Sequence, residues 1–314
     1  MDIKDQQKYF INSLQPGTRI LAWSVVLLFG IGLGQVGSLL ALLINGYDLQ
    51  SLQGLSFMDD VKAIRLMAFA NQVFSFMIPA IFLGLIFFRD QWTAFVGLRT
   101  SANFPAIKAP SLNNAGLAML IMLLSWPLAQ FLYLINMDIP LPDFLIAMED
   151  STNDLIEGIV AVNSLPELLL VLVLVALTPA IGEELMFRGL LQRIITYNGL
   201  NKHLAVIVSA LVFSAIHMQF QGFLTRFALG LILGYLFVFS GSLWISIIAH
   251  FLFNGSQVII AYFTKDMMDF SAEPSWSDFS YPIFIGSTLL FLAVGYRFIK
   301  SNESSVTSKN NTHV

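Results

Sequence analysis

The segment Phe223–Phe263, FLTRFALGLILGYLFVFSGSLWISIIAHFLFNGSQVIIAYF, decides the fold class of this chain. It consists of two apolar runs, Phe223–Phe239 and Leu243–Phe263, with only a short Ser-Gly-Ser stretch between them. A helix that crosses the hydrocarbon core of a bilayer needs about 20 apolar residues, because each residue adds about 1.5 Å to its length. The two runs therefore predict two successive transmembrane helices.

Six further apolar runs extend this pattern through the chain. They are Ile20–Leu43, Leu66–Phe88, Leu117–Ile135, Leu168–Ile181, Leu204–Met218 and Pro282–Phe298, of which the fourth and fifth are short. Of the 314 residues, 56% are hydrophobic and 11% are charged, whereas soluble domains contain about 25% charged residues. We predict an all-α, polytopic membrane protein with about eight transmembrane helices, embedded in a lipid bilayer.

The connections between the runs leave no room for a separate soluble domain. The longest connection, residues 136–167, is shorter than a chain that folds alone. We therefore divide the chain into an N-terminal segment, residues 1–19, a transmembrane domain, residues 20–300, and a polar tail, residues 301–314. The tail is expected to be disordered.

The lysines and arginines are distributed unevenly between the two ends of the predicted helices. With eight crossings and a cytoplasmic N-terminus, 12 of the 16 basic residues lie on the side of the termini. The other side receives the remaining four, Lys62, Arg65, Arg226 and Lys265. Because cytoplasmic loops are enriched in basic residues, we expect a multi-pass protein of the plasma (cell) membrane with both termini in the cytoplasm.

The composition excludes several kinds of chemistry. The sequence has no cysteine, so it has no disulfide, no cysteine-bound zinc and no cysteine nucleophile. It also lacks a phosphate-binding loop, a dinucleotide fingerprint and a basic patch of the kind that binds nucleic acid. No nucleic-acid partner is expected.

Glycine pairs and one proline predict where the helices make contact. Gly30 and Gly34, like Gly230 and Gly234, have the four-residue spacing that lets helix backbones approach closely in lipid. Pro179 comes just before a pair of glutamates. Because proline has no N–H, it leaves a backbone carbonyl that a neighbouring group or water must satisfy.

Ionisable side chains in membrane helices cost about 2.5–3.5 kcal/mol each at the bilayer centre, so they are candidates for function. The segment Ile181–Leu191, IGEELMFRGLL, contains three of them. Glu184 and Arg188 are four residues apart and can pair on one helix face. Glu183 points about 100° away and has no partner in its own helix. Alternatively, the helix has reached the cytoplasmic interface at this point, and the pair is an ordinary solvated one.

Two histidines and an asparagine add to this group. His250 and Asn254, in HFLFN, lie four residues apart in the middle of an apolar run, and together they can donate hydrogen bonds to an oxyanion. Their alternative role is structural hydrogen bonding between helices. His217, in FSAIH, lies at the end of another run and is either a catalytic group or a packing residue at the interface. His203 and His313 are expected to be incidental.

This set of residues fits hydrolysis by two schemes, and both stay open at this point. A carboxylate and an imidazole can deprotonate a water molecule while hydrogen-bond donors hold the tetrahedral oxygen. Alternatively, a divalent metal such as zinc, held by a carboxylate and histidines, activates the water. The helical His-Glu-x-x-His signature of soluble zinc proteases is absent, so a metal would need ligands from several helices. No other cofactor is indicated.

Three motifs, EELMFR, FSAIH and HFLFN, follow one another in this order on successive runs. In this order they resemble the CPBP family of intramembrane proteases, which includes the type II CAAX prenyl endopeptidases and the Abi, or bacteriocin-immunity, proteins. The resemblance covers Thr178–Gly255 and indicates a protease core at residues 165–263. It implies eight membrane helices, of which the fourth, fifth and seventh supply catalytic groups around a water-filled chamber.

The resemblance also implies roles for individual residues. Glu183 would activate water together with His217. Glu184 would support the site and pair with Arg188. In the metal-dependent scheme, Glu183, His217 and His250 would hold the metal ion.

In the scheme without a metal, the resemblance implies that His250 and Asn254 would stabilise the oxyanion.

The leading hypothesis is an intramembrane endopeptidase, either glutamate-dependent or metal-dependent, that cleaves a membrane-associated or lipid-anchored polypeptide near the cytoplasmic face. The alternative is a non-catalytic bacteriocin-immunity or membrane scaffold protein of the same fold. A transporter is disfavoured, because the first three runs offer only a few polar residues for a route, namely Gln35, Asn71, Gln72 and Gln130.

Overall fold

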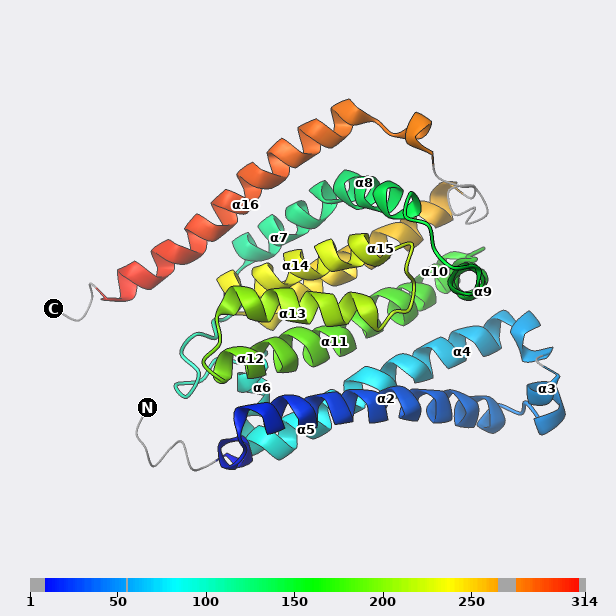
Figure 1. Ribbon diagram of the computed structural model, residues 1–314, viewed down its shortest axis with the longest axis horizontal. Helices are drawn as coiled ribbons and strands as arrows, with labels where there is room; N and C mark the ends of the chain where they lie inside the picture. Colours follow the sequence, from blue (N-terminus) through cyan, green and yellow to red (C-terminus); the bar gives the residue numbers. More distant parts are fainter. Residues whose placement is uncertain (1–8, 55, 265–274, 311–314) are drawn as a thin grey trace.

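The computed structural model describes residues 9–54, 56–264 and 275–310, and within these ranges every regular element is helical (Figure 1). The helices long and apolar enough to cross a membrane are Pro16–Ile44, Val61–Phe95, Leu112–Met137, Leu165–Tyr197, Phe223–Ser240, Leu243–Phe263 and Tyr281–Glu303. A further apolar helix, Lys202–Ala215, is shorter. The predicted all-α membrane fold with about eight transmembrane helices is confirmed.

The long helices lie roughly side by side and form a bundle (Figure 1). One end of the bundle carries α12 (Arg193–Tyr197), the start of α2 (Pro16–Ile44) and the C-terminus of α16 (Tyr281–Asn310). The opposite end carries α3 (Leu49–Gln53) and α9 (Asp143–Val160). The bundle also contains α4 (Val61–Gln72), η3 (Val73–Met77), α5 (Ile78–Phe88), α13 (Lys202–Ala215), α14 (Phe223–Ser240) and α15 (Leu243–Thr264). The charge distribution predicts that the end with α12 faces the cytoplasm.

The fourth membrane helix is much longer than its apolar run. It comprises α10 (Leu165–Val171), η5 (Leu172–Leu177), α11 (Thr178–Glu184), η6 (Leu185–Gln192) and α12, a total of 33 residues. The apolar run predicted that this helix ends at Ile181, and that prediction is wrong. The helix continues because groups in neighbouring helices satisfy the charged side chains that follow. Both η5 and η6 are π-helical, a form that is frequent at functional sites. At about 1.5 Å per residue, Glu183 lies about 27 Å from one end of this helix and about 21 Å from the other.

The connection between the third and fourth membrane helices contains a helix that the sequence did not predict. This helix, α9, has 18 residues. Arg65 of α4 satisfies carbonyl groups at its C-terminal end, because the guanidinium donates to the carbonyl oxygens of Ile159 at 3.1 Å and Ala161 at 2.6 Å. Arg65 is buried at this contact. α9 is thereby fixed to the bundle.

Both glycine pairs lie where helices approach each other closely. In α2, a Cβ atom added at Gly30 or Gly34 would collide with Ser75 of η3. In α14, a Cβ atom at Gly230 or at Gly234 would come within 2.9 Å of side chains on α13. The predicted close packing through these pairs is confirmed, and a larger residue at either position in α14 would push α13 away.

Aromatic packing holds the π-helical segment η6 in place. The ring of Phe187 contacts those of Trp23, Phe76 and Phe213, with centroid distances of 6.0, 6.2 and 5.3 Å. The indole Nε1 of Trp23 also donates to the carbonyl oxygen of Met186 at 3.0 Å. This core fixes the stretch of helix that directly follows the two glutamates.

The chain termini differ in part from what was expected. α16 continues to Asn310, into the segment 301–314 for which disorder was expected, because no proline or glycine follows Gly295 to end the helix. Residues 311–314 lie outside the described part of the chain, as do residues 1–8 of the predicted N-terminal segment.

Candidate active site

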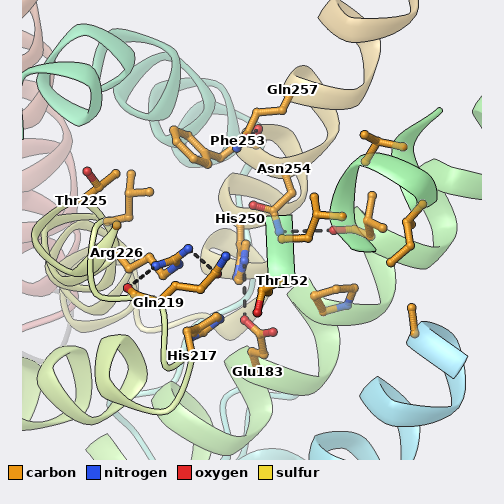
Figure 2. Close-up of a pocket in the computed structure, with 18 of the residues that line it drawn as sticks. Thr152, Glu183, His217, Gln219, Thr225, Arg226, His250, Phe253, Asn254 and Gln257 are labelled. Atoms are coloured by element: carbon orange, nitrogen blue, oxygen red, sulfur yellow. Dashed lines mark hydrogen bonds and ion pairs between the residues drawn. The ribbon is translucent and has the colours of Figure 1, made fainter. Parts of the chain in front are cut away.

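A pocket of about 830 Å³ lies among α4, α9, α11, α14 and α15. Four of the six predicted catalytic residues line it, namely Glu183, His217, His250 and Asn254. Figure 2 shows these side chains gathered in one part of the pocket. The other two, Glu184 and Arg188, lie behind the pocket wall and reach it through His250. The structure therefore brings together residues from two membrane helices and from the turn after α13.

Glu184 and Arg188 form a completely buried ion pair. Nη1 of Arg188 lies 2.6 Å from Oε1 of Glu184, and both side chains are 0% exposed. The guanidinium also donates through Nη2 to the carbonyl oxygen of Gly230 at 3.1 Å, and it lies over the ring of Phe213, 4.6 Å from its centroid. The predicted pairing is confirmed, whereas the alternative of a solvated pair at the membrane surface is wrong.

His250 connects this ion pair to the pocket. Its Nδ1 lies 2.9 Å from Oε1 of Glu184, and its Nε2 lies 3.8 Å from Oε2 of Glu183. Because an ionised carboxylate only accepts hydrogen bonds, Nδ1 is the donor to Glu184. His250 thus makes the inter-helix hydrogen bond that was the alternative to a catalytic role, and it lines the pocket as well.

Glu183 has a different environment from the glutamate beside it. Its side chain is buried, and Oε1 accepts a hydrogen bond from Nε2 of Gln72 in α4 at 3.2 Å. Among the residues that the structure describes, no lysine or arginine nitrogen lies within 4.0 Å of this carboxylate. Glu183 is therefore a carboxylate that faces the pocket without a cationic partner of the kind that Glu184 has.

His217 follows the end of α13 and presents one ring nitrogen for chemistry. Its Nδ1 lies 2.7 Å from the carbonyl oxygen of Phe213. A carbonyl oxygen only accepts hydrogen bonds, so Nδ1 carries the hydrogen and Nε2 of the neutral ring can accept a proton. The next residue, Met218, has a φ of 54°, which is uncommon for a residue other than glycine. This turn leads the chain away from α13 immediately after the histidine.

Asn254 satisfies the backbone carbonyl that the proline leaves free. Its Nδ2 donates to the carbonyl oxygen of Val175 at 3.4 Å. Val175 lies four residues before Pro179, which has no N–H to donate to it. The carboxamide has a second hydrogen, so this structural bond leaves Asn254, which lines the pocket, with one further donor.

Sequence reasoning missed several polar residues that line the pocket. Gln72, noted only as one of the few polar residues in the first runs, donates to Glu183. Glu149 of α9 is buried, and its Oε2 accepts the backbone N–H of Gln221 at 2.8 Å. Arg226 of α14, which the sequence already marks as an ionisable residue of the apolar C-terminal half, lines the pocket too. The partners of Gln72 and Glu149 lie 111 and 72 positions away in the sequence, so no spacing rule could have revealed these contacts.

The residues considered as metal ligands do not form a metal site in this structure. Within the described ranges, no three histidine, aspartate or glutamate side chains are grouped as metal ligands would be. Nδ1 of His250 is already occupied by Glu184, and its Nε2 is 3.8 Å from the nearest oxygen of Glu183. The expected set of Glu183, His217 and His250 is therefore not supported, and we derive no step through a metal ion.

A bundle of membrane helices that encloses glutamates, histidines and an asparagine around one pocket has the composition of an intramembrane hydrolase. Residues 165–256 match the family of Rce1-like type II CAAX prenyl endopeptidases. The matched segment includes all six predicted catalytic residues. This match supports the resemblance to CAAX proteases that the three motifs indicated. No match was found among curated proteins or among solved structures.

Proposed function

We propose that this protein is an intramembrane endopeptidase in which Glu183 and His217 activate a water molecule, and that it cleaves a membrane-associated or lipid-anchored polypeptide. The contrast between two adjacent glutamates carries the proposal. Glu184 is paired with Arg188, whereas Glu183 is 3% exposed, lines the pocket and has no lysine or arginine partner among the described residues. A buried carboxylate without a lysine or arginine partner is suited to take up a proton during a reaction.

The proposed reaction begins with a water molecule between Glu183 and His217. One of the two groups takes a proton from the water, and the resulting hydroxide oxygen attacks the carbonyl carbon of the peptide bond. The C–N bond then breaks while the same proton is delivered to the leaving nitrogen. The products are a new carboxylic acid and a new amine, between which a proton can then pass to give a carboxylate and an ammonium group, so the reaction consumes one water molecule and needs no other reactant.

Hydrogen-bond donors on α15 support this proposal. The free N–H of Asn254 can stabilise the negative oxygen of the tetrahedral intermediate. Because Nδ1 of His250 already donates to Glu184, its Nε2 can donate only from a doubly protonated ring. The Glu184 carboxylate would stabilise the charge on that ring. In this scheme Glu184 and Arg188 are positioning residues, because they act through His250.

The test combines substrate identification with cleavage by the purified protein. First, new amino termini are labelled in membranes of cells that produce either the wild-type chain or Glu183→Gln. Polypeptides that carry a new amino terminus only with the wild-type chain are then reconstituted with the full-length protein in liposomes. We expect Glu183→Gln and His217→Gln each to lower the cleavage rate by about 100-fold or more, as for other general acid–base groups. Glu157→Gln alters an exposed glutamate of α9 outside the pocket and should retain full activity.

Each outcome has a distinct meaning. Cleavage that persists in both Glu183→Gln and His217→Gln contradicts the proposed mechanism. If the wild-type protein cleaves nothing, and Glu183→Gln still restores the phenotype of cells that lack the protein, the chain is a binding or scaffold protein of the same fold.

A further inference from the structure

The pocket wall contains an arginine that has no part in the proposed reaction. Arg226, in the first turn of α14, donates through Nη1 to the backbone carbonyl oxygen of Gln219 at 2.9 Å and through Nη2 to the side-chain oxygen of the same residue. Within the part of the chain that the structure describes, no carboxylate oxygen lies within 4.0 Å of this guanidinium. Such isolation is unusual, because ionisable groups in membrane helices are generally paired.

Neighbouring residues hold the guanidinium in a defined position. Gly222 leaves space for it, because a Cβ atom there would lie 2.9 Å from Cζ of Arg226. Gln219 is buried, and its Nε2 donates to the side-chain oxygen of Asn153 in α9 at 3.3 Å. Figure 2 shows Arg226 and Gln219 on the same side of the pocket as His217. The turn after α13, the start of α14 and the middle of α9 thus fix Arg226 together.

Arg226 also lies close to the groups that would activate water. It interacts electrostatically with both Glu183 and His217. Glu149 interacts with it as well, but Oε2 of Glu149 accepts the backbone N–H of Gln221 and no direct ion pair joins Glu149 to the guanidinium. A guanidinium has five N–H groups, and Gln219 occupies two of them. The remaining donors and the positive charge stay available to a ligand in the pocket.

We propose that Arg226, supported by Gln219, binds a carboxylate group of the substrate. This inference rests on the proposed function and adds a residue that determines specificity. A guanidinium matches the planar geometry of a carboxylate with two parallel hydrogen bonds, and such bonds are about twice as strong as neutral ones. The carboxylate comes either from the C-terminus of a polypeptide cleaved near its end or from an aspartate or glutamate beside the scissile bond.

The experiment measures binding instead of cleavage, so its result does not depend on the proposed reaction. The protein is the full-length Glu183→Gln chain in lipid nanodiscs, in which the probes stay intact. The probes are three fluorescent peptides of one apolar sequence. The first has a free C-terminal carboxylate, the second a C-terminal amide, and the third a C-terminal amide and one internal glutamate. We expect the first or the third to bind about tenfold more tightly than the second. The probe that gains affinity identifies the source of the carboxylate.

Variants then test whether the guanidinium is responsible. Arg226→Gln should reduce the ratio of affinities between the favoured carboxylate probe and the amide probe to less than about twofold. Gly222→Ala keeps the positive charge but displaces the guanidinium, so it should weaken the preference as well. Lys62→Gln removes an exposed positive charge outside the pocket and should change nothing. If Arg226→Gln does not fold, Gly222→Ala and Gln219→Ala decide the question.

Two results would overturn this inference. One is equal binding of all three probes, including no binding by any of them. The other is a preference that survives both Arg226→Gln and Gly222→Ala. Either result leaves the proposed function intact, because that function rests on cleavage by the wild-type protein. Conversely, cleavage that persists in both Glu183→Gln and His217→Gln would contradict the proposed mechanism without affecting the measured preference for a carboxylate.

Discussion

The two adjacent glutamates should differ strongly in how much the same substitution destabilises the fold. Glu184→Gln removes the negative charge that lies 2.6 Å from Arg188, and both side chains are 0% exposed. At a charge separation of about 4 Å and an effective dielectric constant of about 20, the lost attraction is about 4 kcal/mol. Removing one partner of a buried pair costs about 3–5 kcal/mol, because the other charge is left uncompensated. We expect a loss of this size in the free energy of unfolding.

Glu183→Gln removes a carboxylate that has no such partner. Its amide oxygen can still accept the hydrogen bond that Gln72 donates over 3.2 Å, whereas the 3.8 Å approach to His250 and the longer-range attraction to Arg226 are lost. Burying a neutral amide costs less than burying an ionised carboxylate. The free energy of unfolding should therefore fall by less than about 1 kcal/mol, or rise. Proteolytic activity should nevertheless be lost.

The assay is unfolding of the purified protein in mixed micelles with increasing amounts of SDS, followed by circular dichroism. Arg188→Gln and the double variant Glu184→Gln/Arg188→Gln complete a double-mutant cycle, with an expected coupling energy of about 1.5 kcal/mol or more. Equal destabilisation by Glu183→Gln and Glu184→Gln would refute the reasoning, and so would a coupling energy near zero.

Three other predictions follow from the helix contacts, the ligand geometry and the charge distribution. Gly30→Ala should destabilise the fold by about 1–3 kcal/mol, because the added methyl group meets Ser75. Gly32→Ala, in the same helix with nothing within 4 Å, should be neutral or stabilising by up to about 1 kcal/mol, and thermal unfolding compares the two. Cleavage by the reconstituted protein should survive exhaustive chelation, and loss of activity that added zinc restores would contradict this expectation. A cysteine added at either end of this cysteine-free chain should react with an impermeant thiol reagent only from the cytoplasmic side, and labelling from the outside would reverse the predicted topology.

Features that depend on local helix geometry could be predicted from the sequence. The four-residue spacing of Glu184 and Arg188 places them on one face in any helix, and the structure pairs them. Pro179 must leave a carbonyl without its helical donor, and Asn254 satisfies it. The glycine pairs predicted close contacts for the same reason, because small residues permit close approach whatever the partner helix is.

Features that depend on partners in other helices could not be predicted in this way. Gln72 and Glu183 are 111 positions apart, and nothing in their local sequences indicates that they meet. Charged residues ended the fourth apolar run in the sequence, yet the helix continues because Gly230, His250 and other distant groups satisfy them. α9 was missed because its acidic residues interrupt the apolar pattern and its C-terminal end depends on Arg65.

Glu183 lies near the middle of a 33-residue helix that is long and apolar enough to cross a membrane, so a membrane-spanning substrate that reaches it would present its peptide bond between helices and not in bulk water. In the hydrocarbon region a polypeptide keeps its helix, because each unsatisfied backbone group costs several kcal/mol. The carbonyl to be attacked is then already hydrogen-bonded and covered by the side chains around it. A membrane-spanning segment must therefore unwind where it is cut. Glycine, proline or polar residues that ease this unwinding would set the order in which membrane polypeptides are cleaved.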